Sequence, residues 1–457
     1  MTTAARMKTA ALSERLDHLE RPGSTASGER LLSLEEALER LLDGVETLPA
    51  EMAPLQEAAG RILGADLYAD GALPPWDNTA MDGFAVRSID VAGAAPDRPV
   101  PLRVAGEVAA GQTPSKPVEA GTAVRIMTGA PLPPGADAVV PIEDTSAWLG
   151  PRAVVGAPLP ATIDIRRSVA PGEHVRRRGE DVEAGSRVLR AGERLGAGAV
   201  TLAAAVGRDR VSVVRRPHVA LLATGDEIVE PGQPAGDGQI HDANTAGISV
   251  LARRAGAAAR SFGIAGDDLA AVQARLTEAL AWADVVVVTG GVSVGARDVV
   301  KDAFEAIGTV DFWRVAVQPG KPLAFGRSAR PRGAPAGGPV LLFGLPGNPV
   351  SSYVTFELFV RPAVRRLSGG DPRARRTRRA VLAERATKSP ERRAFLRVRL
   401  EEPTRPGDLP VARLSGGQGS HVVTALAAAD ALAVVPEGIA AAEAGSEVEV
   451  WPLEEDA

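Results

Sequence analysis

The stretch Asp284-Val-Val-Val-Val-Thr-Gly-Gly-Val-Ser-Val-Gly-Ala-Arg-Asp298 predicts the fold of the central part of this chain. Its four consecutive valines are typical of a strand that is buried on both faces, as in a parallel sheet. Gly290 and Gly291 then predict a tight turn, and apolar residues at helical spacing follow from residue 299 to residue 307. Strand, glycine turn and helix together present backbone N–H groups and a helix N-terminus to an anion.

A carboxylate, Asp298, follows this turn where the next helix is expected to begin. Because a carboxylate repels a bare phosphate, we expect a divalent cation between the two groups. The alternative interpretation is that Asp298 only caps the helix.

Two further apolar strands are predicted to end in turns of similar character. Residues 218–224 lead into Gly225-Asp-Glu227, and residues 340–344 lead into Leu345-Pro-Gly-Asn-Pro349 before a helix from about 350 to 367. Between them, Asp267 and Asp268 precede an amphipathic helix and are suited to cap it. Ligands of open α/β sheets bind at the carboxyl edge, so the three turns together predict a ligand site there.

The composition of the chain excludes several kinds of catalytic and metal-binding site. With 457 residues the chain is expected to form three or four domains, and its net charge of −5 gives no general reason to expect nucleic acid or membrane binding. The absence of cysteine excludes thiolate catalysis, iron–sulfur clusters and disulfides, and no two of the five histidines have metal-ligand spacing. No apolar run approaches membrane-spanning length and no signal-peptide pattern is present, so we expect a cytoplasmic protein.

Outside the α/β region the pattern changes several times. Ser33 and Glu36 form a capping-box pattern that opens a helix, and a second helix is expected around residues 55–62. Short strands separated by Gly and Pro predict β-domains at about 84–148 and 380–457. Residues 327–338 are interpreted as a flexible insertion, and the basic run 373–379 as a solvated linker.

Seven motifs occur in order along the chain: Asp77-Asn-Thr-Ala-Met-Asp-Gly83, Arg125-Ile-Met-Thr-Gly-Ala-Pro131, Arg176-Arg-Arg-Gly-Glu-Asp181, Thr224-Gly-Asp-Glu227, Gly290-Gly-Val-Ser-Val-Gly295, Pro319-Gly-Lys-Pro322 and Leu345-Pro-Gly-Asn-Pro349. With them the chain resembles the MoeA family of molybdopterin molybdenumtransferases, which includes the E-domain of gephyrin. The resemblance extends from Ser33 to Trp451.

The resemblance implies a multidomain α/β and β protein: a central doubly wound α/β domain of the molybdopterin-binding type, an inserted β-domain, a small split domain and a C-terminal β-barrel-like domain. The expected ranges are 1–29 for a disordered tail, 30–60 and 165–210 for the split domain, 61–164 for the inserted β-rich domain, 211–368 for the α/β domain and 380–457 for the C-terminal domain. It also implies a homodimer whose active sites are shared between subunits, and contact with an adenylyl-transferring partner enzyme.

The implied reaction is insertion of molybdate into adenylylated molybdopterin with release of AMP, supported by Mg²⁺. The residues expected to act in catalysis are Asp77, Asp82, Thr128, Asp181, Glu227, Asp267 and Asp298, of which Glu227, Asp267 and Asp298 would also hold the metal. The residues expected to bind substrate are Gly290, Gly291, Ser293, Gly295, Arg314, Gln318, Lys321, Pro346, Gly347, Asn348 and Ser420.

The chain departs from the family pattern just before Pro319-Gly-Lys-Pro322. Arg314 and Gln318 stand where lysines are common, and the neutral Gln318 leaves the preference for molybdate or tungstate open. Two alternatives from other classes also stay open: a scaffold that binds pterin without turnover, and an adenylyl transferase acting on molybdopterin. The acidic residues favour turnover, because a scaffold has no need for them.

Overall fold

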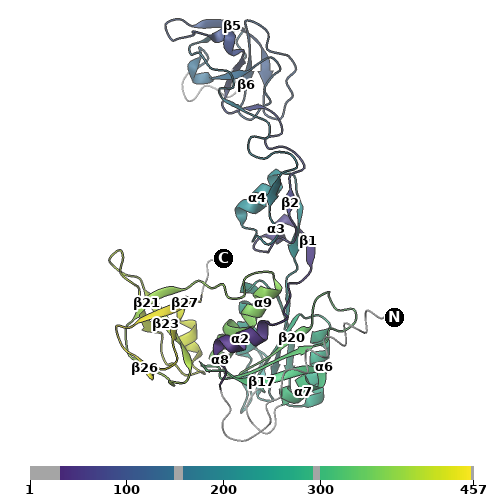
Figure 1. The fold of residues 1–457 in the computed structure, drawn as a ribbon, viewed down its shortest axis with the longest axis vertical. Coiled ribbons are helices and arrows are strands. Elements are labelled where there is room, and N and C mark those ends of the chain that lie inside the picture. The colour runs from purple at the N-terminus through teal and green to yellow at the C-terminus, as the bar shows by residue number, and fades with distance from the viewer. Residues whose placement is uncertain (1–30, 149–157, 292–298, 454–457) are drawn as a thin grey trace.

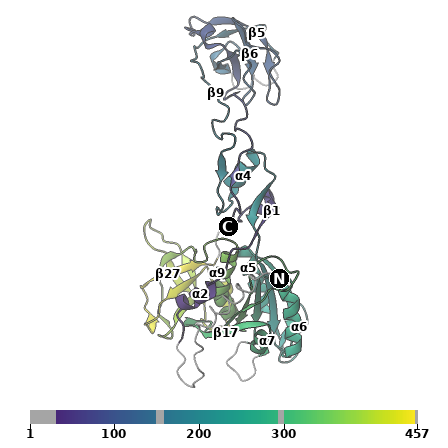
Figure 2. The same cartoon turned by 45° about the vertical axis from the view of Figure 1, so that its right-hand side comes forward.

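The computed structural model describes residues 31–148, 158–291 and 299–453, and shows an elongated molecule (Figure 1). A β-domain lies at one end, a narrow stem domain follows, and an α/β domain and a C-terminal domain lie side by side at the other end, as the second view also shows (Figure 2). The expected disordered tail, 1–29, lies outside the described residues.

The α/β domain is built on a six-stranded sheet in the order β15-β12-β16-β20-β19-β17. The strands are β12 His218–Thr224, β15 Ala258–Ala265, β16 Val285–Thr289, β17 Gly308–Arg314, β19 Pro322–Ser328 and β20 Val340–Leu345. The first four in this order are parallel, and β19 runs antiparallel to both of its neighbours, β20 and β17. The three strands predicted at 218–224, 285–288 and 340–344 are therefore confirmed as neighbours.

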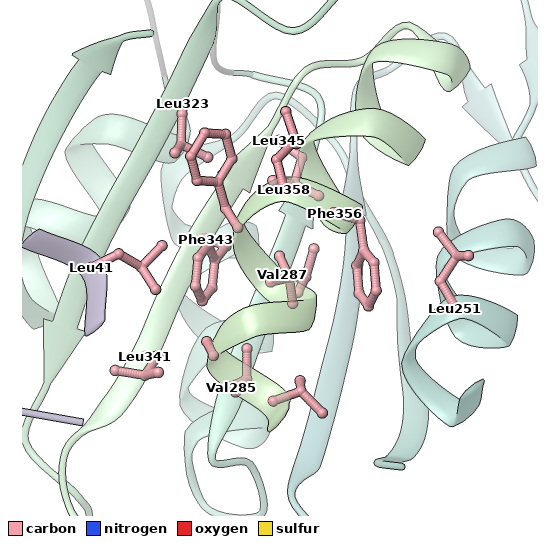
Figure 3. Close-up of a cluster of buried hydrophobic side chains, with 14 of the residues drawn as sticks. Leu41, Leu251, Val285, Val287, Leu323, Leu341, Phe343, Leu345, Phe356 and Leu358 are labelled. Atoms are coloured by element: carbon pink, nitrogen blue, oxygen red, sulfur yellow. The ribbon is translucent and has the colours of Figure 1, made fainter. Parts of the chain in front are cut away.

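Helices cover both faces of this sheet, which confirms the doubly wound arrangement. One face packs on α5 Ala243–Arg254 and on the helical run α8 Pro349–Thr355, the π-helical segment Phe356–Val360 and α9 Arg361–Leu367 (Figure 3). The other packs on α6 Leu269–Leu280 and α7 Val299–Ile307. Because strand side chains alternate, Val285 and Val287 enter the first core and Val286 and Val288 the second.

The first described helix, α2 Leu34–Leu42, begins with the predicted capping box, in which the side chains of Ser33 and Glu36 each accept the other's backbone N–H. Its buried leucines Leu34 and Leu41 pack into the first core of the α/β domain, where Figure 3 shows Leu41. The expected boundaries placed this helix in the split domain. The structure places it with the α/β domain, because that is where its apolar face is buried.

The stem domain is formed by two segments far apart in the sequence. Strand β1 Ala50–Pro54 pairs with β11 Arg210–Val214, and β2 Leu67–Tyr68 pairs with β10 Arg187–Leu189. The helices are α3 Leu55–Ala58 and α4 Ala197–Ala205. Strand β2 thus lies in the stem although the expected boundaries gave it to the inserted domain. The helix expected at 55–62 is shorter, because Gly60 has a positive φ of 77° and ends it.

The distal β-domain has a five-stranded sheet in the order β7-β4-β6-β5-β8. Its strands are β4 Gly83–Val86, β5 Val100–Val108, β6 Thr122–Ile126, β7 Ala138–Pro141 and β8 Thr162–Ile165. A short pair, β3 Asn78–Thr79 with β9 Val175–Arg176, lies at the neck between this domain and the stem, where Figure 2 labels β9.

The C-terminal domain is a small barrel. Its strands are β21 Arg378–Leu382, β23 Arg393–Glu401, β24 Val411–Leu414, β25 Ala431–Val435 and β27 Glu447–Pro452, and a pairing of β23 with β25 closes the ring. Strand β18 Val317–Gln318 comes from the α/β domain and pairs with β23. The minor elements are β22 Ala386–Thr387, β26 Ala441–Ala442 and α10 Val423–Ala427.

Two segments expected to be loose are fixed by arginines. In the insertion, the Arg330 guanidinium donates to Asp284 Oδ1 at 2.8 Å and to the Gly338 carbonyl at 2.8 Å. In the basic run, Arg375 donates to Glu357 Oε2 at 2.8 Å and lies 4.3 Å above the Trp451 ring. The prediction of a solvated linker is therefore wrong at Arg375, and Arg330 ties the insertion to Asp284. Among the described helices, none has the length and apolar character needed to span a membrane.

Candidate active site

The turn after β16 needs glycine at both positions. Gly290 and Gly291 have φ angles of 93° and 62°, a region that L-residues avoid. A Cβ added at Gly290 would lie 2.5 Å from the Thr224 carbonyl oxygen, and one at Gly291 would lie 2.5 Å from Val300 Cγ2. The Gly290 N–H also donates to the Leu345 carbonyl at 3.2 Å. The two turns after β16 and β20 are therefore held together by backbone contacts.

The turn after β20 lies directly against Gly290. A Cβ added at Gly347 would meet Gly290 Cα at 3.7 Å, an ordinary contact distance. The buried Ser352 hydroxyl donates to the Pro346 carbonyl, whereas Gly347 and Asn348 are exposed. Within the described part of the chain, the N–H groups of Gly347 and Asn348 donate to no protein acceptor. They are thus available to an anionic ligand.

The expected acidic residues follow two neighbouring strands. Asp226 and Glu227 come after β12 and Asp267 comes after β15, and these strands pair in parallel up to Thr224 and Ala265. Asp226 Oδ1 accepts the N–H of Asp267 at 3.1 Å, and the carboxylate of Glu227 folds back over Gly225. Glu227 and Asp267 are both exposed. The structure therefore brings these carboxylates to the same edge as the glycine turns.

The cap of the following helix is a different residue from the one that we considered for a metal. Asp268 Oδ2 accepts the Ala271 N–H at 2.9 Å and caps α6, so the alternative role for Asp267 as that cap is wrong. The described residues contain no cluster of three potential metal ligands. The third expected ligand, Asp298, lies outside the described residues, as do Ser293 and Gly295.

The C-terminal domain reaches this edge through Ser420. Asn348 Nδ2 donates to Ser420 Oγ at 3.0 Å, and the Val350 N–H donates to the Ser420 carbonyl at 3.1 Å. Ser420 therefore meets the turn after β20, and its role in substrate binding stays a prediction.

A buried arginine that the sequence analysis missed supports the Ser420 loop. Arg397 on β23 is 1% exposed, and its Nη2 donates to the carbonyls of Gly417 and Gly419 at 2.9 and 3.1 Å. Burial lowers the pKa of Arg397 to about 10. The available signal was a charge at an inward position of the apolar strand 394–398, a pattern that indicates a fixed polar role.

The remaining basic and polar candidates lie farther along the sheet. Gln318 Oε1 accepts the Ser389 N–H at 3.1 Å, so this side chain joins β18 to the C-terminal domain. Arg314 and Lys321 are exposed near the ends of β17 and β19, and a backbone bond of 2.9 Å from Val315 N–H to the Lys321 carbonyl holds this corner.

The other expected catalytic residues lie at the neck of the distal domain. Asp82 Oδ1 accepts both the backbone N–H and the hydroxyl of Thr128, at 2.6 and 2.7 Å. The Asp77 carboxylate accepts the backbone N–H of Arg178 at 2.7 Å and a guanidinium N–H of Arg177 at 2.8 Å. These two bonds, the backbone one first, lower the pKa of the Asp77 carboxyl, so it is held ionised.

The fourth residue of this group, Asp181, is exposed, and its N–H donates to the Leu73 carbonyl at 3.0 Å. Trp76, which precedes Asp77 in the sequence, is 48% exposed. Within a single chain the stem domain separates this neck from the carboxyl edge of the α/β sheet (Figure 1). The structure therefore brings the expected site residues into two groups, and does not join the groups in one chain.

Comparison with known proteins covers nearly all of the described chain. Three family models match: "MoeA N-terminal region (domain I and II)" at residues 32–207, "Probable molybdopterin binding domain" at 220–366 and "MoeA C-terminal region (domain IV)" at 379–453. A protein of Mycobacterium tuberculosis named molybdopterin molybdenumtransferase 2 is 39% identical over 88% of this chain and 94% of its own length. A molybdopterin molybdenumtransferase of Haemophilus influenzae is 33% identical over 93% and 99%.

Solved structures give the same result. The crystal structure of a molybdopterin biosynthesis MoeA protein from Pyrococcus horikoshii matches with a TM-score of 0.73 and 34% identity, covering 93% of this chain and 100% of that one. The similarity therefore includes the order of the domains as well as their individual folds.

Proposed function

Because this chain belongs to the MoeA family of molybdopterin molybdenumtransferases, we propose that it is the transferase that inserts molybdate into adenylylated molybdopterin with release of AMP. The observation that carries the proposal is the convergence of three turns at one sheet edge, after β12, β16 and β20. Such an edge is the binding position of open α/β sheets.

The edge is suited to a substrate with several negative charges. The exposed N–H groups of Gly347 and Asn348 are uncommitted donors in the described structure, and the Ser420 hydroxyl lies beside them. Backbone N–H groups near the start of a helix bind phosphate oxygens without the need for a charged side chain. The absence of cysteine does not conflict with this chemistry, because the dithiolene sulfurs that receive molybdenum belong to the substrate.

A magnesium ion fits the donors that the chain offers. Glu227 and Asp267 are exposed carboxylates at the ends of neighbouring strands, and hard cations prefer such oxygen ligands. We propose that they hold Mg²⁺ together with Asp298. The ion would neutralise charge on the pyrophosphate, while the protein orients the phosphate groups through its N–H donors.

A homodimer would unite the two groups of site residues. Asp77, Asp82 and Thr128 are ordered by hydrogen bonds at the neck, yet the sheet edge of the same chain lies at the far side of the stem. We propose that the neck of one subunit completes the sheet edge of the other. The proposal also places the protein in the cytoplasm, where an adenylyl-transferring enzyme would supply its substrate.

The proposed reaction is tested by incubating the purified full chain with adenylylated molybdopterin, Mg²⁺ and molybdate, and measuring AMP. We expect AMP release that depends on molybdate. Tight binding without AMP release would instead indicate a scaffold, and tungstate replacing molybdate at equal rate would show that the site does not select between the two oxyanions. Light scattering that gives only the 47.2 kDa monomer would contradict the dimer.

A further inference from the structure

The side-chain amide of Asn244 joins the start of α5 to the turn after β20. Asn244 Nδ2 donates to the Gly347 carbonyl at 2.8 Å, a contact between residues 103 positions apart in the sequence. The helix does not need this side chain as a cap, because Asp242 Oδ1 already accepts the Thr245 N–H at 2.9 Å. The amide therefore has another purpose.

The orientation of this amide follows from its partner. The Gly347 carbonyl can only accept, so the group that faces it must be the NH₂ of Asn244 rather than its oxygen. The opposite atom, Asn244 Oδ1, is buried and has no hydrogen-bond partner in the described structure. A side chain that leaves one buried oxygen unpaired in order to hold a turn carries a cost, which indicates that the turn geometry matters.

Peptide planarity transmits this contact to the ligand side. In a trans peptide the C=O and the following N–H point in opposite directions. Because the Gly347 carbonyl is directed to Asn244, the Asn348 N–H is directed away from it, and no described protein group accepts that N–H. The Asn348 side chain is also fixed, since it donates to Ser420 Oγ at 3.0 Å.

We propose that Asn244 is a positioning residue for the reaction: it fixes the Gly347–Asn348 peptide so that the Asn348 N–H faces the anionic part of the adenylylated pterin. This inference rests on the proposed function. Glycine is the residue whose backbone rotates most freely, so the peptide after Gly347 needs an external contact to hold one orientation. Asn244 supplies that contact from a rigid helix.

The test compares Asn244→Asp and Asn244→Leu with the control Thr245→Ala, which alters the same helix turn without touching Gly347. Both Asn244 variants keep the branching of the side chain at Cγ but lose the donor. We expect each to weaken binding of adenylylated molybdopterin by about tenfold or more, because small errors in position cost heavily in preorganised sites. The control should bind as the wild type does.

The two variants separate positioning from charge. Aspartate is well tolerated in the first turn of a helix but also adds a negative charge beside the anion site, so the neutral Asn244→Leu decides whether lost positioning alone weakens binding. Deuterium exchange of the Val350 N–H, which donates to the Ser420 carbonyl, gives a readout in the free protein that is independent of activity, and we expect faster exchange in both variants. Binding and exchange equal to the wild type would overturn the inference.

The inference about Asn244 and the proposed transfer reaction can be refuted separately. If the wild type binds the adenylylated pterin but releases no AMP, the transfer reaction is refuted. The relative affinities of the wild type and the variants for the pterin still decide the role of Asn244. If the wild type binds no pterin, both proposals are overturned.

Discussion

Replacing Gly290 by alanine should damage the site far more than the same change at Gly347. At Gly290 the positive φ of 93° costs an alanine about 1–2 kcal/mol. The new Cβ would also lie 2.5 Å from the Thr224 carbonyl oxygen, so the backbone of two paired strands must shift, at a typical overpacking cost of about 1–3 kcal/mol. The expected local destabilisation is about 2–5 kcal/mol from these two terms.

At Gly347 neither cost applies. This glycine is not in the left-handed region, and an added Cβ would meet only Gly290 Cα, at 3.7 Å. Alanine there should change local stability by less than about 1 kcal/mol. Each variant thus adds one methyl group at one of two adjacent turns, and we expect a large loss of local stability at Gly290 and a small change at Gly347.

Hydrogen exchange of the β16 and β20 amides is the suitable assay, because it reports local opening in a chain of several domains. A loss of about 2–5 kcal/mol corresponds to faster exchange by at least about thirtyfold in Gly290→Ala, since each 1.4 kcal/mol is tenfold. Similar exchange in the two variants would refute the argument that backbone contact at Gly290 holds the turns together.

Three further predictions concern single residues. Asp298→Asn should abolish molybdate-dependent AMP release while pterin binding persists, because the variant loses a proposed metal ligand and keeps the backbone donors; normal turnover would leave Asp298 as a cap only. Gln318→Lys should lower the molybdate concentration for half-maximal AMP release at low ionic strength, because it adds a positive charge near the anion. It should also lower the thermal stability, because the Ser389 N–H loses its acceptor. An unchanged molybdate concentration for half-maximal release would show that residue 318 lies too far from the anion to affect its binding. The pKa of Asp77 is lowered in the folded protein, so its contacts stabilise the neck fully at pH values above its ordinary pKa of 3.8. This stabilisation is lost as the pH falls through the lower pKa of the folded state. The difference in free energy of unfolding between wild type and Asp77→Asn should therefore shrink only at the acidic end of a pH series.

The parts of the fold that the sequence predicted are those with strong local patterns. The valine run of β16 is apolar at every position because both faces are buried, and the Ser33 capping box marks the start of α2 by chemistry within one turn. The same holds for the glycine turn, since Gly290 and Gly291 are required by φ and by close contacts.

The missed features depend on residues far apart in the chain. Nothing near Leu41 shows that its helix packs on the α/β core, because an amphipathic stripe does not specify its partner. Asn244 meets Gly347 and Arg397 supports the Ser420 loop only after folding; Asn244 looks like an ordinary polar residue in the sequence, and the charge of Arg397 within an apolar strand does not show which loop it supports. The fixed positions of Arg330 and Arg375 likewise depend on distant acceptors, so composition alone suggested loose segments.

The central claim is that one active site is assembled from two chains, and mixing two inactive variants tests it most directly. Asp82→Asn would disable the neck group and Glu227→Gln the sheet edge, and each homodimer should release no AMP. After mixing and exchange of subunits, half of the dimers are mixed, and each mixed dimer has one site with both wild-type groups. AMP release should therefore recover to about a quarter of the wild-type rate, as two-fold symmetry requires. No recovery, with subunit exchange demonstrated, would contradict the shared site.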